Sequence, residues 1–203
     1  MQFLLTISRL IDQINLRVGR WVSWTILAAV VVSSANALSR KFLHSGSNAW
    51  LELQGYLFGA LFLLASGYTL LKNGHVRVDV LSSKLSPRAQ TWIEIMGTLL
   101  FLLPAAVLIM VLAWPMFWDA WVTQEGSPNA GGLIRWPAKL LVPVGFTLLV
   151  GAGISHLIKC IGFLRGLCPD PTRRESAMTD EEKLAAELKL RLETEAEAAP
   201  RKD

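Results

Sequence analysis

The hydrophobic positions of the chain fall into four long runs separated by short polar segments. Each run approaches or exceeds the roughly 20 apolar residues that a helix needs to cross a hydrocarbon core of about 30 Å. Only helices and closed barrels satisfy their backbone polar groups inside lipid, and these runs are too long and too continuous for barrel strands. The pattern therefore predicts an all-α membrane protein with four transmembrane helices, at about 21–39, 51–71, 93–114 and 140–164.

A different pattern precedes the first run. Apolar residues recur there at three- and four-residue spacing with charged and amide side chains between them, which is typical of an amphipathic helix lying in the membrane interface. Residues 1–20 are assigned to this helix, although a simple extension of the first span fits the same residues. No small-residue cleavage site closes the first run, so we expect that span to remain in the protein. The periodic positions are Leu4, Ile7, Ile11, Ile14 and Val18.

The distribution of Lys and Arg predicts the orientation of the spans. Most of these residues precede the first run, lie between the second and third runs, or follow the fourth, whereas few lie in the other two loops. By the positive-inside rule, both termini and residues 72–80 are expected in the cytoplasm. The formal charge of +4 and the pI near 9.3 come from these dispersed loop residues, which predicts membrane orientation and no nucleic-acid partner.

The composition changes after Pro169 and Pro171. The last stretch is rich in Ala, Glu, Leu and Lys, and it is read either as a helix or as a disordered segment. The expected organisation is an amphipathic segment at 1–20, a four-helix transmembrane domain at 21–165 and a charged cytoplasmic tail at 166–203.

Few polar residues interrupt the spans. Glu52 and Glu94 lie near span ends, where interfacial anchoring or a subunit contact is favoured over ligation of a transported ion. Gly55 and Gly59 form a GxxxG pattern, which predicts a helix-packing face. Pro104 in the third span predicts a kink, because proline cannot donate its backbone hydrogen bond. The two cysteines lack the spacing of a metal site and the context of a disulfide.

Residues 72–80, KNGHVRVDV, place four charged or titratable side chains, Lys72 among them, in a short segment between spans. His75, Arg77 and Asp79 alternate with valines, so an extended chain would direct the polar groups to one face and the valines to the other. General acid and base chemistry needs such groups to converge with a nucleophile or a metal ligand, which the sequence does not provide. The residues alone favour a cytoplasmic interfacial loop.

Two segments resemble a known family. The run GYLFGALFLLASGYTLLKNGHVRVDVL, with Pro87 near the next span, is similar to the small membrane subunit, of the DctQ type, of the tripartite ATP-independent periplasmic (TRAP) transporters. The run QEGSPNAGGLIRWPAKLLVPVG, residues 124–145, resembles the outer loop and fourth-span entry of the same subunit. The resemblance covers roughly residues 15–165 and excludes the tail.

The resemblance implies an accessory role in transport. The expected function is a small permease subunit in the bacterial inner membrane that forms a heterodimer with a large elevator-type subunit and braces it. That complex would take up an organic acid, delivered by a periplasmic substrate-binding protein, at the expense of a sodium gradient. The chain itself would bind no cofactor and would not be an enzyme, and its remaining contacts would be membrane lipids.

The resemblance also suggests which residues meet partners. His75, Arg77 and Asp79 would anchor the cytoplasmic junction of spans two and three, against the large subunit. The others lie on the outer side, where the large subunit and the docked binding protein are expected, although each of these residues fits an intramolecular polar contact equally well. They are Glu52, Glu125, Arg135, Trp136 and Lys139.

Two other classes of function need features that this sequence does not show. An autonomous four-helix proton-coupled exporter of small compounds needs a carboxylate deep in its first span, and none is present there. A membrane enzyme or redox anchor needs a convergent catalytic set or paired haem ligands. His156, the one histidine within a span, has no such companion in the sequence.

Overall fold

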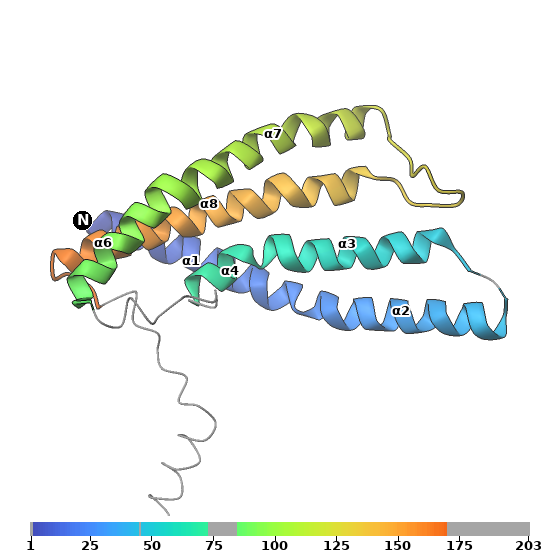
Figure 1. Cartoon of the computed structure of the whole chain (residues 1–203), viewed down its shortest axis with the longest axis horizontal. Coiled ribbons are helices and arrows are strands. Elements are labelled where there is room, and N and C mark those ends of the chain that lie inside the picture. The colour runs from blue at the N-terminus through green and yellow to red at the C-terminus, as the bar shows by residue number, and fades with distance from the viewer. Residues whose placement is uncertain (1, 45, 73–84, 170–203) are drawn as a thin grey trace, which may run out of the picture. The chain divides into compact units, whose positions relative to one another are not determined.

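The computed structural model describes residues 2–44, 46–72 and 85–169, all of which lie in one compact unit, Met1–Thr172. Every regular element in these ranges is helical (Figure 1). Four stretches are long and apolar enough to cross a membrane: Gln2–Phe42, Asn48–Leu71, Pro87–Val122 and Trp136–Leu164. The predicted all-α membrane fold with four spans is thus confirmed. The tail from residue 170 onward, like His75, Arg77 and Asp79, lies outside the described residues, and the predicted domain division stays a prediction.

The first stretch consists of two helices, α1 (Gln2–Val22) and α2 (Trp24–Phe42). They meet at Ser23, whose hydroxyl donates to the Gly19 carbonyl at 2.9 Å. At 1.5 Å per residue, α2 alone measures about 28 Å, enough for the hydrocarbon core. The N-terminal segment is thus helical and is separated from α2 only by the break at Ser23. Its place in the membrane interface, as opposed to an extension of the first span, stays a prediction.

The second stretch is interrupted. Helix α3 (Asn48–Leu64) ends at Ala65, and the short α4 (Ser66–Leu71) follows. The Ser66 hydroxyl donates to the Leu63 carbonyl at 2.7 Å, so this break satisfies one of the acceptors that it exposes. The Ser66–Gly67 pair is a local signal for this break, which the sequence analysis did not predict.

The third stretch carries a different irregularity. Helices α6 (Pro87–Gly97) and α7 (Leu103–Val122) are joined by a π-helical turn, η1 (Thr98–Leu102), directly before Pro104. The Leu103 amide bonds to the Thr98 carbonyl, five residues back. A widened turn removes the clash between a proline ring and the preceding carbonyls. The helix thus contains a π-turn just before Pro104, and the predicted kink stays a prediction. The fourth stretch, α8 (Trp136–Leu164), is one continuous helix.

The helices follow one another in the order α7, α8, α3, α2, with each packed on the next (Figure 1). Small side chains make these contacts close, as in many membrane proteins. Buried alanines recur every seven residues on α7, which packs mainly on α8, while large apolar side chains point outward, as expected for lipid or a partner subunit. The buried alanines of α7 are Ala106, Ala113 and Ala120.

Helix α1 packs on α8 and α4. The three helices cross closely at Gly67, where an added Cβ would clash with the Asn15 carboxamide of α1 and would lie 3.1 Å from the Leu148 carbonyl oxygen of α8. By contrast, nothing lies within 4 Å of a Cβ placed on Gly55, and Gly59 would meet only Leu141. The GxxxG prediction is therefore wrong for Gly55 within this chain, and the small residue that packs closely is Gly67.

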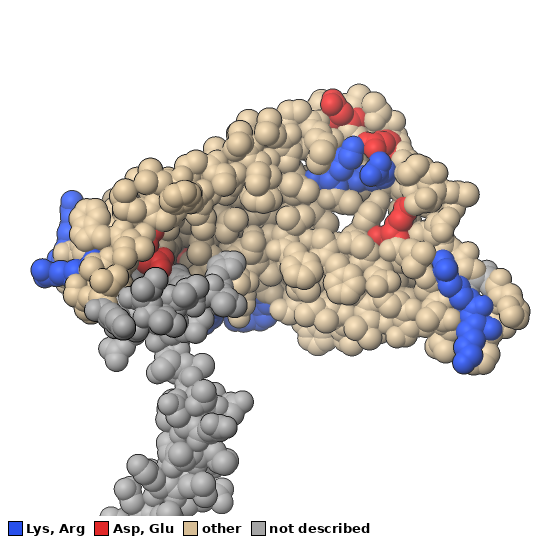
Figure 2. Space-filling view, in the orientation of Figure 1, with Lys and Arg blue, Asp and Glu red and all other residues tan. Residues whose placement is uncertain are grey.

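The charged residues are separated along the helices. Figure 2 shows uncharged surface between the charged side chains near loops 43–47 and 123–135 and those toward the opposite end. We call the end of the bundle that carries loops 43–47 and 123–135 the loop end. We call the opposite end, where α1 begins and α8 ends, the terminal end.

Candidate functional site

Helix α3 presents three polar side chains, one turn apart, to the loop that joins α7 to α8. Residues four apart share a helix face, and Asn48, Glu52 and Tyr56 all bond to residues 127–134. Asn48 Nδ2 donates to the Ala130 carbonyl at 3.0 Å, and the Tyr56 hydroxyl donates to the Ile134 carbonyl at 3.2 Å. This face of α3 thus fixes the path of the loop.

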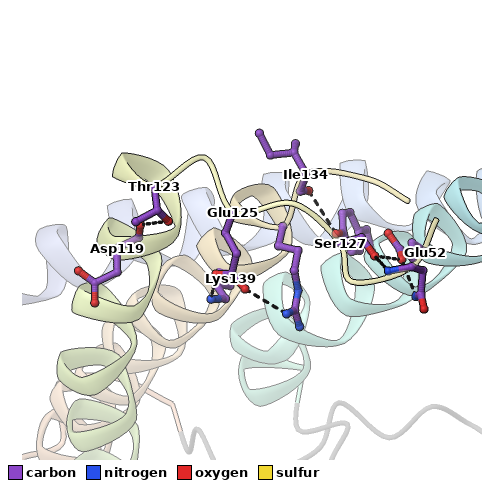
Figure 3. A network of polar contacts seen from close by, with 10 residues as sticks. Glu52, Asp119, Thr123, Glu125, Ser127, Ile134 and Lys139 are labelled. Atoms are coloured by element: carbon purple, nitrogen blue, oxygen red, sulfur yellow. Dashed lines mark hydrogen bonds and ion pairs between the residues drawn. The ribbon is translucent and has the colours of Figure 1, made fainter. Parts of the chain in front are cut away.

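The Glu52 carboxylate is the centre of these contacts (Figure 3). Its Oε1 accepts from the Ser127 hydroxyl and from Asn129 Nδ2 at 2.9 Å, and its Oε2 accepts from the Leu133 amide at 2.7 Å. Three donors from one loop converge on one carboxylate, and hydrogen bonds to charged acceptors are among the stronger ones in proteins. Glu52 therefore acts as a clamp for the loop.

Gly132 makes this clamp sterically possible. A Cβ at position 132 would lie 2.5 Å from the Ser127 side chain and 2.7 Å from Glu52 Oε1. Those separations are shorter than van der Waals contact, so any larger residue would displace the carboxylate or the loop. Of the two glycines in the sequence AGG, Gly132 thus serves a close approach, whereas Gly131 has the left-handed backbone (φ 69°) that glycine favours.

A second carboxylate ties the loop to the start of α8. Glu125 Oε1 accepts from Arg135 Nη1 at 3.0 Å, and Glu125 Oε2 bonds to Lys139 Nζ (Figure 3). The Arg135 amide also donates to the Glu125 carbonyl at 2.8 Å. The hydrogen bond from Lys139, together with the positive charges of Lys139 and Arg135, lowers the pKa of Glu125 from its usual 4.5.

Aromatic rings join α7 to α8 beside this ion pair. The rings of Trp121 and Trp136 meet edge to face with centroids 4.5 Å apart, an arrangement that aromatic pairs prefer. Between the clamp and Arg135, an open cavity of about 240 Å³ is lined by Glu52, Tyr56, Ser127, Pro128, Asn129 and Arg135.

A polar cluster that the sequence analysis did not identify lies at the terminal end, between α1 and α8. The Ser155 hydroxyl donates to Asp12 Oδ1 at 2.5 Å and lies 2.7 Å from the Ser8 hydroxyl. Asp12 Oδ2 forms an ion pair with Lys159 Nζ. Ser8 and Ser155 are almost completely buried, so α1 is held to α8 by polar groups as well as by shape.

Another pair joins α8 to α6. His156 Nε2 lies 3.4 Å from Glu94 Oε2 and 3.6 Å from Cys160 Sγ, with the His156 side chain 6% exposed. Glu94, expected as an interfacial anchor, thus has a partner inside the bundle. Among the described residues, no three His, Cys, Asp or Glu side chains are grouped so that they could hold a metal ion.

The structure brings five of the eight predicted contact residues together at the loop end, where each of the five contacts another part of this chain. Their contact with partners stays a prediction. The terminal-end cluster was missed because Asp12, Ser155 and Lys159 belong to segments 143 or more residues apart. The sequence signal for this cluster was Ser155, one turn before Lys159 near the end of an apolar helix.

Comparison with known proteins identifies the family. The family model described as "Tripartite ATP-independent periplasmic transporters, DctQ component" matches residues 7–162, from within α1 almost to the end of α8. No curated protein and no solved structure gives a significant match. The matched range includes both loop-end carboxylates and the cluster between α1 and α8. The chain therefore belongs to the DctQ family, the small membrane component of TRAP transporters, which is a transporter component and not an enzyme.

Proposed function

We propose that this chain is the stationary small subunit of a TRAP transporter. It braces a large elevator-type subunit in the bacterial inner membrane, forms a heterodimer with it, and supports sodium-driven uptake of an organic acid that a periplasmic binding protein delivers. The loop end faces the periplasm, and both termini lie in the cytoplasm. Family membership supports association with a large membrane subunit and a binding protein as a general property of DctQ components.

The bracing role rests on one observation: both loop-end carboxylates, Glu52 and Glu125, are bonded to groups of this same chain. Glu52 accepts three hydrogen bonds and Glu125 bonds to two cations, all within the chain. A carboxylate that releases and rebinds a transported ion has to exchange its ligands during each cycle. These two instead join α3, the loop and α8 into one piece, which suits a fixed scaffold.

The proposal also assigns the partner surfaces. Arg135, Trp136 and Lys139 lie at the start of α8, where their side chains hold the loop shape that the large subunit and the docked binding protein would meet. His75, Arg77 and Asp79 are proposed to contact the large subunit on the cytoplasmic side. No cofactor is proposed for this chain, and the sodium gradient acts on the complex as a whole.

Cross-linking within the loop end tests the bracing role. Cysteines at Asn48 and Ala130, whose side-chain amide and carbonyl are 3.0 Å apart, would be joined by a short bifunctional thiol reagent in a background with Cys160 and Cys168 replaced by serine. The complex with its large subunit and binding protein is then assayed for sodium-dependent uptake in proteoliposomes. A stationary brace predicts uptake equal to that of each single-cysteine control.

Loss of uptake on cross-linking, with recovery after cleavage of the cross-link, would show that this loop moves during transport. That result would reject the stationary role. Gentle-detergent purification of the chain from its native membrane provides the matching test of association, because a brace should bring a large polytopic subunit with it in near-equal amount. A chain that purifies alone as a stable homo-oligomer would instead favour the exporter alternative.

A further inference from the structure

The surface of α1 is divided lengthwise into three stripes. The stripe that packs against the other helices holds the small or polar residues Ser8, Asn15 and Gly19, all buried. The other two stripes are exposed, and because residues three, four and seven apart share a helix face, each keeps one character along the helix. One is apolar and contains Phe3, Leu10, Ile14 and Trp21, which are between 45% and 76% exposed.

The third stripe is basic. Arg9, Arg17 and Arg20 are exposed on it, and none of them forms an ion pair with another described residue. The carboxylate nearest in sequence, Asp12, is engaged by Ser155 and Lys159 on the packed side of the helix. Three guanidinium groups therefore lie beside an exposed apolar stripe with no ion-pair partner among the described residues, a pattern typical of helices that bind anionic membrane surfaces.

A cavity lies where the basic stripe meets the end of α8. It has a volume of about 330 Å³ and is lined by Leu5, Ser8, Arg9, Lys159, Leu167, Cys168 and Pro169. The Lys159 ammonium has three protons and uses one bond for Asp12, so it can still donate into the cavity, as can Arg9. The remaining lining is mostly apolar. Cationic donors beside apolar walls complement a phosphate attached to an acyl chain.

We propose that this cavity binds an anionic phospholipid. Arg9 and Lys159 hold the headgroup phosphate, the acyl chain lies along Leu5 and Leu167, and Arg17 and Arg20 extend the attraction to neighbouring anionic headgroups. The bound lipid would seal the junction of α1 and α8 at the membrane surface. This inference does not depend on the proposed transport role, because it concerns the surface of this chain alone.

Native mass spectrometry of the full chain in a mild non-ionic detergent tests the proposal. The chain is offered equimolar phosphatidylglycerol and phosphatidylcholine with identical acyl chains, and the ratio of the two adducts is measured. We expect phosphatidylglycerol to be preferred. In Arg9→Gln/Arg17→Gln the preference should fall by an average of about fivefold per arginine replaced. The matched control is Arg40→Gln/Lys41→Gln, which removes two exposed cations at the loop end and should keep the preference.

Single variants locate the site. Arg9→Gln should weaken the preference more than Arg17→Gln, because only Arg9 lines the cavity. Equal adducts in the parent chain, or equal losses in the loop-end control, would overturn the proposal. Millimolar inorganic phosphate that removed the phosphatidylglycerol adducts would show a site for free anions, which also contradicts a lipid site. Thermal stability of each variant, measured without lipid, must match the parent so that lost binding is not lost folding.

Discussion

The ion pair and hydrogen bonds of Asp12 should make a measurable contribution to the stability of this chain. The Asp12 side chain is 16% exposed, its Oδ1 accepts from Ser155 at 2.5 Å, and its Oδ2 pairs with Lys159, whose side chain is 30% exposed. Hydrogen bonds to charged groups contribute about 1.5–3 kcal/mol. Removing one partner of a fully buried ion pair costs about 3–5 kcal/mol, and partial exposure here lowers that cost. We therefore expect Asp12→Ala to reduce the free energy of unfolding by about 2 kcal/mol.

The assay is equilibrium unfolding of the full chain by titration of mixed micelles with sodium dodecyl sulfate, followed by tryptophan fluorescence. A double-mutant cycle with Lys159→Ala isolates the pair, for which we expect a coupling energy of about 1 kcal/mol, within the range of polar contacts between membrane helices. Arg17→Ala is the control on the same helix, because Arg17 is exposed and such substitutions change stability by less than about 0.5 kcal/mol.

The reasoning would be refuted by an Asp12→Ala variant that is as stable as Arg17→Ala. A normal loss for Asp12→Ala with no coupling to Lys159 would have a narrower meaning. The loss of stability would then come from the Ser155 hydrogen bond, and the ion pair with Lys159 would not contribute to holding α1 on α8.

Four further predictions concern the loop end and the orientation of the chain. Because Glu125 has a lowered pKa in the folded chain, its contribution to loop stability should be full above the unfolded value of about 4.5 and be lost as pH falls through the lower folded value; amide exchange protection of residues 126–134 should show this dependence, and Glu125→Gln should reduce it, although the Glu52 carboxylate still clamps the same loop. Gly132→Val should open the loop to protease, whereas Gly126→Val should not, since a Cβ at 126 meets nothing within 4 Å. In a background without the native cysteines, a membrane-impermeant maleimide should label Gly126→Cys in intact cells and Leu167→Cys only after permeabilisation; the reverse pattern would invert the proposed orientation. Arg77→Ala should reduce co-purification of the large subunit more than it reduces the amount of this chain, and equal co-purification would contradict its assigned contact.

The sequence by itself determined the class of the protein and the number of its spans. Helices in lipid must satisfy their own backbone and meet a fixed hydrocarbon thickness, so the length of an apolar run is nearly sufficient evidence for a span. An irregularity near Pro104 is local for the same reason, since a missing amide hydrogen acts within one turn, although the sequence predicts a kink and the structure has a π-turn there. The two motifs that resemble the TRAP small subunit were likewise local, and the family match agrees with them.

Only the tertiary structure decided which polar residues meet. Glu52 finds its donors 75 to 81 residues later, and Asp12 finds Ser155 at a separation of 143. Such pairings depend on the order in which helices pack, which hydrophobic periodicity does not encode because all faces of a membrane helix can be apolar. The sequence does not distinguish Gly55 from Gly67 for the same reason, since both lie in one apolar run. Only the packing of α1 leaves no room for a side chain at Gly67.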